Sequence, residues 1–343
     1  MTTPDHPARP SPAPGRRTGP AAVARTLVGV AVAAALVVWG LPWVSGVGWG
    51  EIGRVLRAVP PAHAIGFQAL MLAALGGYAI TLAAPLPGLS WPRALVLNLA
   101  GSAVSKVAPG GGAVGLAATF GIARSWGHRT EAVATSALVT GVWNLLARIA
   151  VPLLALGLLW ADGLGLPGSL VGPLRVTSIV LTVVLALLVA ALASDRVARA
   201  LRLAGVRRRT LAVVRARWPV LTLGLAIMLG IQWVLFHLVM RDVGVTLPLV
   251  PLFAGYAVGR LASAVGVTPG GIGLTEVATT GALVAWGADP AAASAGAVLF
   301  AVVTNLMEVP IGGLAWLWWA VDPTGARRGG IAGTDDATGD VSG

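Results

Sequence analysis

Residues 107–127, VAPGGGAVGLAATFGIARSWG, and residues 267–287, VTPGGIGLTEVATTGALVAWG, carry the same Pro-Gly-Gly break within apolar sequence. Nine positions are identical when the two stretches are aligned at an offset of 160 residues. Proline removes a backbone donor and glycine permits positive φ, so each break predicts a turn between two helical arms. Arms of about 17 residues are short for a ~30 Å hydrocarbon core, which favours re-entrant hairpins over complete spans.

The composition places both breaks in a membrane protein. Of the 343 residues, 56% are hydrophobic and 11% are charged, whereas soluble proteins carry about 25% charged residues. The mean hydropathy is +0.83. These values exclude an ordinary soluble enzyme. The absence of cysteine also excludes disulfides and thiolate metal ligands.

Six uninterrupted apolar runs are each long enough to cross the hydrocarbon core as a helix. They cover residues 23–44, 61–84, 132–160, 176–193, 220–240 and 291–319, and the broken stretches cover residues 91–126 and 249–286. Three of the runs separate the two broken stretches, so an odd number of crossings places the breaks on opposite faces. The sequence therefore predicts an all-α polytopic membrane protein with an inverted-topology repeat, two Pro-Gly-Gly-broken re-entrant helical hairpins and about six full transmembrane helices.

One transmembrane domain, residues 23–320, is expected between two disordered cytoplasmic tails, residues 1–22 and 321–343. Its repeat halves are expected at about residues 61–160 and 219–320. A basic cytoplasmic loop is expected at residues 195–218, where it would lie on anionic headgroups. A site for a partner protein is the alternative interpretation of this loop.

Basic residues are distributed unequally between the two faces that this topology defines. Seventeen of the 24 Lys and Arg residues fall on the face of the first tail and four on the other face. Positive charge accumulates on the cytoplasmic side, so a plasma-membrane protein with both termini in the cytoplasm is predicted. Residues 45–60 are expected to lie along the outer interface, because Trp49, Arg54 and Arg57 are spaced as in an interfacial segment.

Five ionisable residues lie within or beside apolar runs, where a charge is costly and a functional role is the first interpretation: Lys106, Arg148, Arg260, Glu276 and Glu308. Lys106 and Arg260 can each bind a phosphate or pair with a buried carboxylate, and the sequence does not decide between these roles. Glu276 either neutralises a helix N-terminus or couples to substrate or protons. Arg148 and Glu308 occupy similar places after the two breaks, which predicts a structural ion pair between them.

The residues of the two breaks are further candidates for binding a ligand. Freed amides at the start of each second arm form a positive helix end, which suits an anion such as a lipid phosphate. The alternative is a pair of packing kinks between close helices, which glycine also permits. The candidates are Pro109, Gly110, Gly111 and Gly112 in the first break, and Pro269, Gly270, Gly271 and Gly273 in the second.

The remaining motifs indicate no enzymatic, metal or nucleic-acid chemistry. Residues 110–115 fit the dinucleotide pattern G-x-G-x-x-G, but they lie between membrane-length apolar arms and the second copy lacks the third glycine. No nucleophile elbow, phosphate-binding P-loop or paired-histidine metal motif is present. Gln68, Gln232 and His237 are interpreted as groups that hydrogen-bond between helices. We therefore expect no catalysis, no cofactor, no metal and no nucleic-acid partner.

Residues 255–278, GYAVGRLASAVGVTPGGIGLTEVA, resemble the P-G-G-x-G-x-x-E signature of the lysylphosphatidylglycerol synthase transmembrane region, a family of flippase-like membrane proteins. Residues 97–127 look like the first half of the same family, and the resemblance covers about residues 25–320. In the multiple peptide resistance factors this region is implied to move aminoacylated phosphatidylglycerol between leaflets, while a separate soluble domain makes the lipid. Only 23 residues follow Ala320, so the resemblance implies lipid binding or translocation and not synthesis.

This chain departs from the family pattern at two places. Many members carry an acidic residue and then an arginine after the first break, where this chain has Ala113, Val114 and Leu116. Relatives often place an arginine before proline after the second hairpin, where this chain has Asn305 and Glu308. The resemblance therefore does not fix the lipid headgroup.

The sequence favours a non-enzymatic protein that binds or flips an anionic phospholipid or a polyprenyl-linked precursor through a cavity between two inverted hairpins. The alternative is a membrane partner or scaffold for a separately encoded lipid synthase or glycosyltransferase. A membrane-embedded enzyme that acts on lipid is least favoured, because the sequence supplies no nucleophile or metal set.

Overall fold

The computed structural model describes four ranges of the chain and isolated positions between residues 38 and 186; the ranges are residues 48–107, 112–172, 204–263 and 272–321. Every regular element in these ranges is helical, which confirms the predicted all-α class. Two predicted spans, residues 23–44 and 176–193, lie almost entirely outside the described residues. So do the Pro-Gly-Gly turns and nearly all of both predicted tails.

Four helical segments are long and apolar enough to cross a membrane. They are α4 (Pro61–Ala83), α7 (Thr130–Ala161), α10 (Ala204–Asp242) and a segment that runs from α13 (Pro290–Ala301) to α14 (Glu308–Val321). A five-residue π-helix, η3 (Val302–Leu306), connects α13 to α14. Length and composition thus confirm four of the predicted spans.

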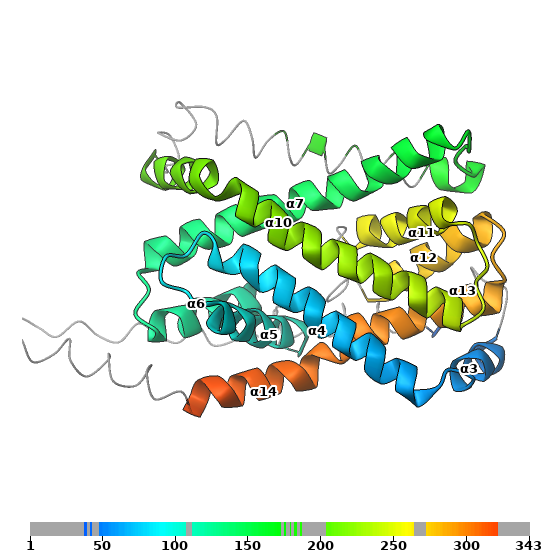
Figure 1. Cartoon of the computed structure of the whole chain (residues 1–343), viewed down its shortest axis with the longest axis horizontal. Coiled ribbons are helices and arrows are strands. Elements are labelled where there is room, and N and C mark those ends of the chain that lie inside the picture. Colours follow the sequence, from blue (N-terminus) through cyan, green and yellow to red (C-terminus); the bar gives the residue numbers. More distant parts are fainter. Residues whose placement is uncertain are drawn as a thin grey trace, which may run out of the picture.

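Two pairs of shorter helices occupy the broken stretches. The first pair is α5 (Trp91–Val107) and α6 (Gly112–Ser125), and the second is α11 (Leu249–Ala262) and α12 (Leu274–Ala285). The arms have 17, 14, 14 and 12 residues, so at ~1.5 Å per residue each is shorter than a ~30 Å hydrocarbon core. The arms of each pair pack against each other, and the two pairs lie toward opposite ends of the long axis of the molecule (Figure 1).

The second arms of the two pairs end in the same way. Gly127 follows α6 with a φ of 85°, and Gly287 follows α12 with a φ of 93°. The amide after each glycine donates to the carbonyl five residues earlier, at 3.3 Å after Gly127 and 3.0 Å after Gly287. These bonds belong to the Schellman motif, in which glycine adopts the left-handed conformation at least cost. The Trp-Gly sequence shared by the two copies therefore has the same structural role in both.

Close crossings at glycine bring the arms of each pair together. Gly101 of α5 lies directly against Thr119 of α6, and Gly259 of α11 lies directly against Thr279 of α12. A Cβ atom at either glycine would overlap the threonine hydroxyl, so the arms approach closely because the side chain is absent. The glycine precedes its threonine by 18 residues in the first pair and by 20 in the second. Equivalent residues of the two copies are therefore 158 positions apart before the break and 160 positions apart after it.

The last helix of each predicted half covers the hairpin of the other half. α14 packs on α5, and α7 packs on α11. At the first contact a Cβ atom added to Gly312 would lie 2.5 Å from the Leu99 carbonyl oxygen. α4 and α10 make the other extensive contact, where Thr81 Oγ1 donates to Leu221 O at 3.0 Å. Neither hairpin is therefore packed by its own half alone.

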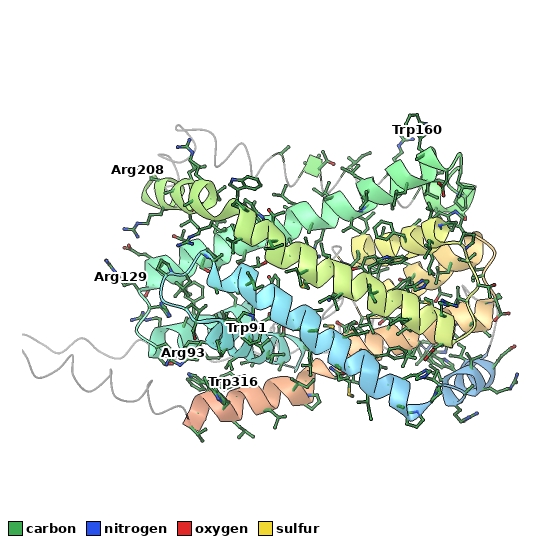
Figure 2. The ribbon with its side chains drawn as sticks, in the orientation of Figure 1. Trp91, Arg93, Arg129, Trp160, Arg208 and Trp316 are labelled. Atoms are coloured by element: carbon green, nitrogen blue, oxygen red, sulfur yellow. The ribbon has the colours of Figure 1, made fainter. Side chains whose placement is uncertain are left out.

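Arginines from separate parts of the chain gather at one end of the molecule. Arg93, Arg129 and Arg208 lie at one end of the long axis (Figure 2), as the sequence predicts for residues of one face. The amphipathic helix α3 (Trp49–Arg57) lies at the other end, where its Ile52 is fully buried in the cluster that includes α13. This placement agrees with the interfacial segment expected between residues 45 and 60.

Residues 204–218, part of the predicted basic loop, are helical and not a loop. They form the first turns of α10, which continues through Pro219 into the apolar span. Arg209 pairs with Glu131 at the start of α7, so this basic arm is attached to a neighbouring helix. Arginine favours helix about as strongly as leucine does, and the loop prediction gave too much weight to charge.

The glycine crossing in the first hairpin is tested by two matched substitutions in α6. A Cβ atom at Gly115 would lie 2.7 Å from both Gly101 O and Ser105 Cβ, whereas one at Gly121 would meet nothing within 4 Å. Overpacking costs about 1–3 kcal/mol, so Gly115→Ala should lower the unfolding temperature of the protein in detergent. Gly121→Ala should leave it unchanged or raise it slightly, because alanine favours helix. Equal effects of the two substitutions would contradict the close crossing.

Candidate functional site

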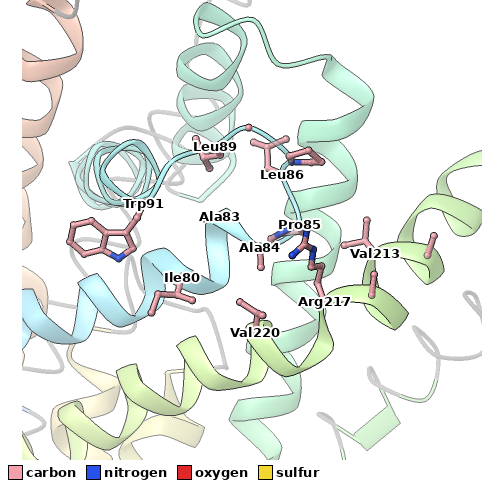
Figure 3. A pocket seen from close by; sticks show the side chains of 14 residues that line it. Ile80, Ala83, Ala84, Pro85, Leu86, Leu89, Trp91, Val213, Arg217 and Val220 are labelled. Carbon is pink, nitrogen blue, oxygen red and sulfur yellow. The ribbon is translucent and has the colours of Figure 1, made fainter.

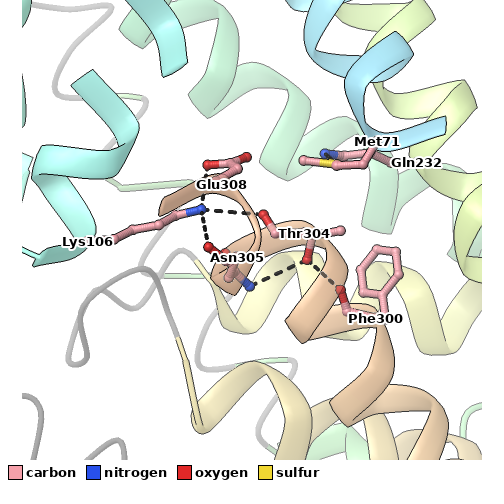
Figure 4. A network of polar contacts seen from close by, with 7 residues as sticks. All are labelled: Met71, Lys106, Gln232, Phe300, Thr304, Asn305 and Glu308. Carbon is pink, nitrogen blue, oxygen red and sulfur yellow. Dashed lines mark hydrogen bonds and ion pairs between the residues drawn. The ribbon is translucent and has the colours of Figure 1, made fainter. Parts of the chain in front are cut away.

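Lys106 and Glu308 form a buried ion pair between the two halves. Lys106 Nζ lies 2.5 Å from Glu308 Oε2, and the two side chains are 13% and 7% exposed. The same ammonium group donates to Thr304 O at 3.3 Å and to Asn305 O at 3.2 Å (Figure 4). An ammonium group has three donors, and these contacts use all three. Of the two roles open to Lys106 from the sequence, the structure therefore shows pairing with a carboxylate.

The predicted pair between Arg148 and Glu308 is wrong, because Glu308 pairs with Lys106. Arg148 instead donates from Nη1 to Ser263 O at 3.0 Å, at the end of α11. The physical reason is the packing of each last helix on the hairpin of the other half. Side chains at equivalent places in α7 and α14 face hairpins and not each other.

The two inter-half contacts occupy equivalent places in the repeat. Ser263 follows the crossing glycine Gly259 by four residues, as Ser105 follows Gly101. Ser263 therefore corresponds to Ser105, the residue directly before Lys106. In one contact the hairpin supplies the cation and the long helix supplies the anion. In the other the long helix supplies the cation, and the hairpin supplies only a neutral carbonyl. Within the described residues, the second contact therefore leaves a positive charge without a carboxylate partner.

Arg260 adds a second guanidinium near Arg148. Its Nη1 donates to Gln232 Oε1 at 3.4 Å, and its Nε is buried without a hydrogen-bond partner. The charges of Arg148 and Arg260 are close enough to repel each other, and the Tyr78 hydroxyl lies within the field of both. Asn144 donates to that hydroxyl at 2.5 Å, which fixes it beside the arginines.

Neither guanidinium has a carboxylate partner among the described residues. The ion pairs in this part of the chain join His63 to Asp242, Lys106 to Glu308 and Arg209 to Glu131. A guanidinium presents five donors, and the contacts of Arg148 and Arg260 that the described residues show are to neutral oxygens. The partly buried arginine pair is therefore a site of positive charge with unused donors.

Glu276 caps the second arm of the second hairpin. Its side chain is almost fully buried, and Oε2 accepts a hydrogen bond from Gly273 N at 2.6 Å. Gly273 has a φ of 89°, a conformation that favours glycine and places its amide under the carboxylate. The expected role at a helix N-terminus is thus confirmed, while coupling to substrate or protons stays a prediction.

The other candidates from the breaks are described only in part. Gly112 begins α6 and is exposed, and Gly273 precedes α12. Pro109, Gly110, Gly111, Pro269, Gly270 and Gly271 lie outside the described residues. The predicted anion site at their amides stays a prediction.

The polar residues that the sequence assigns to contacts between helices have different outcomes in the structure. Gln232 bridges helices as predicted, through Arg260 and a 4.0 Å contact with Met71 Sδ. Among the described residues, buried polar atoms of Gln68 and His237 have no partner, which does not confirm the interpretation of these two as bridging groups. Tyr78 was not predicted, because a single tyrosine in an apolar run carries no signal of its contacts.

The geometry defines a polytopic helical membrane protein with two pairs of short helices and, at the end of α11, two neighbouring arginines. The model of the family Lysylphosphatidylglycerol synthase TM region matches residues 26–312, and the chain belongs to this family. No curated protein matches the sequence. Within the described ranges, no group of three or more His, Asp or Glu residues is placed to hold a metal ion.

The buried pair is tested by removing its members singly and together. Removing one partner of a buried ion pair costs about 3–5 kcal/mol, because the other charge stays in an apolar setting. Lys106→Met and Glu308→Met should each lower the unfolding temperature strongly, and the double variant should lose less than the sum. Glu131→Gln, which removes an exposed pair, should change little. Strictly additive losses at positions 106 and 308 would contradict the pair.

The cap is tested by two substitutions at Glu276. Gln retains an acceptor oxygen for the Gly273 amide, whereas Ala removes it, and loss of a cap costs about 1 kcal/mol. Glu276→Gln should therefore unfold near the wild-type temperature, and Glu276→Ala should unfold earlier. If both variants unfold equally early, the negative charge and not the hydrogen bond stabilises this helix end.

Proposed function

We propose that this protein binds the phosphate of an anionic phospholipid or of a polyprenyl-linked precursor at Arg148 and Arg260 and moves it between leaflets without enzymatic chemistry. The observation that carries the proposal is the uncompensated pair of guanidiniums. Both belong to apolar helices, and both donate only to neutral oxygens among the described residues.

The energetic argument starts from the cost of a charge inside a membrane. An arginine at the centre of a spanning helix costs about 2.5–3.5 kcal/mol on insertion scales, and such residues usually mark the path of a substrate. Two neighbouring guanidiniums add mutual repulsion to that cost. A phosphate removes both terms, since guanidinium and phosphate match in charge and in bidentate geometry.

An inverted arrangement of the hairpins supports movement between leaflets. The two helical pairs have the same glycine crossings and the same C-terminal caps, and they lie toward opposite ends of the molecule (Figure 1). Hairpins that enter from opposite faces and share a mid-membrane site are the arrangement that secondary transporters use for alternating access. The amides of the two Pro-Gly-Gly breaks would then provide further donors for the phosphate.

The proposal includes the orientation of the protein in the membrane. The basic end, which carries Arg93, Arg129 and Arg208, faces the cytoplasm of the plasma membrane by the rule that positive loops stay inside. Both termini then lie in the cytoplasm. α3 lies on the outer surface.

Leaflet exchange in vesicles tests the function. Purified protein is reconstituted with labelled phosphatidylglycerol or labelled phosphatidylcholine, and the rate at which label leaves the outer leaflet is measured. Phosphatidylglycerol should exchange faster than phosphatidylcholine. Arg148→Gln and Arg260→Gln should slow this exchange about tenfold or more, the effect of losing one charge-assisted hydrogen bond.

The matched control is Arg54→Gln, which removes an exposed arginine of α3 and should leave exchange unchanged. Unfolding temperatures of all variants separate loss of function from loss of fold. Unchanged exchange in both arginine variants would contradict the site. Absence of exchange by the folded wild-type protein would contradict translocation and favour a partner or scaffold for a lipid synthase or glycosyltransferase.

A further inference from the structure

A groove of about 600 Å³ lies near the basic end, away from the arginine pair. It is bounded by the last turns of α4, by the connection from α4 to α5 (residues 84–90) and by α10 on both sides of Pro219 (Figure 3). Its volume is in the ~300–1,000 Å³ range of small-molecule sites. Neither Arg148 nor Arg260 lines it, so the groove is separate from the site proposed above.

The lining of the groove combines apolar walls with one charge. Ile80, Leu86 and Val213 are among its apolar residues, and Arg217 is the one charged residue among the described residues that line it. The α10 side also carries Ala212 and Ala216, whose small side chains leave room between the helices. A ligand that fills this space needs an apolar segment and an anionic group.

Tryptophans mark the depth of the groove in the membrane. Trp91 lines it and is 47% exposed, and Trp218, next to Arg217, is 55% exposed. Exposed tryptophans are typical of the membrane–water interface. Ile80 and Val220 extend the walls from this level into the two apolar spans. The charged part of the groove therefore lies at headgroup depth and its apolar part at acyl-chain depth.

We propose that this groove holds an anionic phospholipid of the leaflet at the basic end, with its phosphate at Arg217 and part of an acyl chain between α4 and α10. The apolar walls alone do not select a ligand, but the arginine at headgroup depth favours a phosphate whose negative charge is not offset by a cation on the same headgroup. Two further arginines of the basic arm, Arg208 and Arg215, raise the local concentration of anionic lipid. The bound lipid stays in the groove beside the basic arm and is not the transported molecule.

Accessibility of a single cysteine tests this site independently of leaflet exchange. The chain contains no cysteine, so Ala216→Cys gives one reactive thiol in the groove. Labelling by a water-soluble maleimide is measured in nanodiscs of phosphatidylcholine alone and of phosphatidylcholine with phosphatidylglycerol. Phosphatidylglycerol should slow labelling about tenfold, as expected for one charge-assisted contact.

Two further variants assign the protection to the arginine. Arg217→Gln in the Ala216→Cys background should abolish the difference between the two membranes. Arg215→Gln, a neighbouring arginine that does not line the groove, should preserve it. Equal labelling in both membranes would overturn the proposal, as would protection that survives Arg217→Gln. Slow labelling already in phosphatidylcholine alone would also overturn it, since the occupant would then be phosphatidylcholine itself or another part of this chain.

Discussion

The ion pair between Lys106 and Glu308 is the contact on which the arrangement of the two halves depends. In a hydrocarbon core a charge or a free backbone group finds no water, so every such group needs a partner within the protein. All three acceptors of the Lys106 ammonium come from η3 and α14, in the other half of the repeat. The hairpin α5–α6 therefore cannot bury its own cation. The same constraint explains why each last helix packs on the opposite hairpin.

The two halves differ in how they follow this structural rule. The contact at Glu308 is neutral overall, whereas the equivalent contact at Arg148 joins a cation to a carbonyl oxygen. Arg260 increases the imbalance, and Gln232 offers it only a neutral oxygen. A symmetric pair of salt bridges would leave no reason to admit an anion. Under the proposed function, this asymmetry is what lets the interior bind a phosphate, and it arises because both members of the ion pair are replaced in the other contact.

The sequence predicted the membrane class, the four described spans and the two broken stretches, because apolar length and Pro-Gly-Gly breaks are local properties. It also predicted that Glu276 lies at a helix N-terminus, because the contact there joins Glu276 to Gly273, only three residues earlier in the chain. Pairing across the halves was not predictable, because an ungapped alignment hides the two-residue shift between Gly101–Thr119 and Gly259–Thr279. The sequence also does not show that each last helix packs on the hairpin of the other half, so Arg148 and Glu308 were expected to meet each other. Side-chain partners in a membrane bundle depend on helix rotation, which composition does not encode.

The sidedness of the two hairpins tests the inverted arrangement most directly. Ser90 precedes α5 and Thr246 precedes α11, and both residues are exposed. Single cysteines at these positions, in a chain that has none, can be labelled with a membrane-impermeant maleimide in right-side-out and in inside-out vesicles. The inverted repeat predicts that each type of vesicle labels one position and not the other. Labelling of both positions from the same face would contradict it.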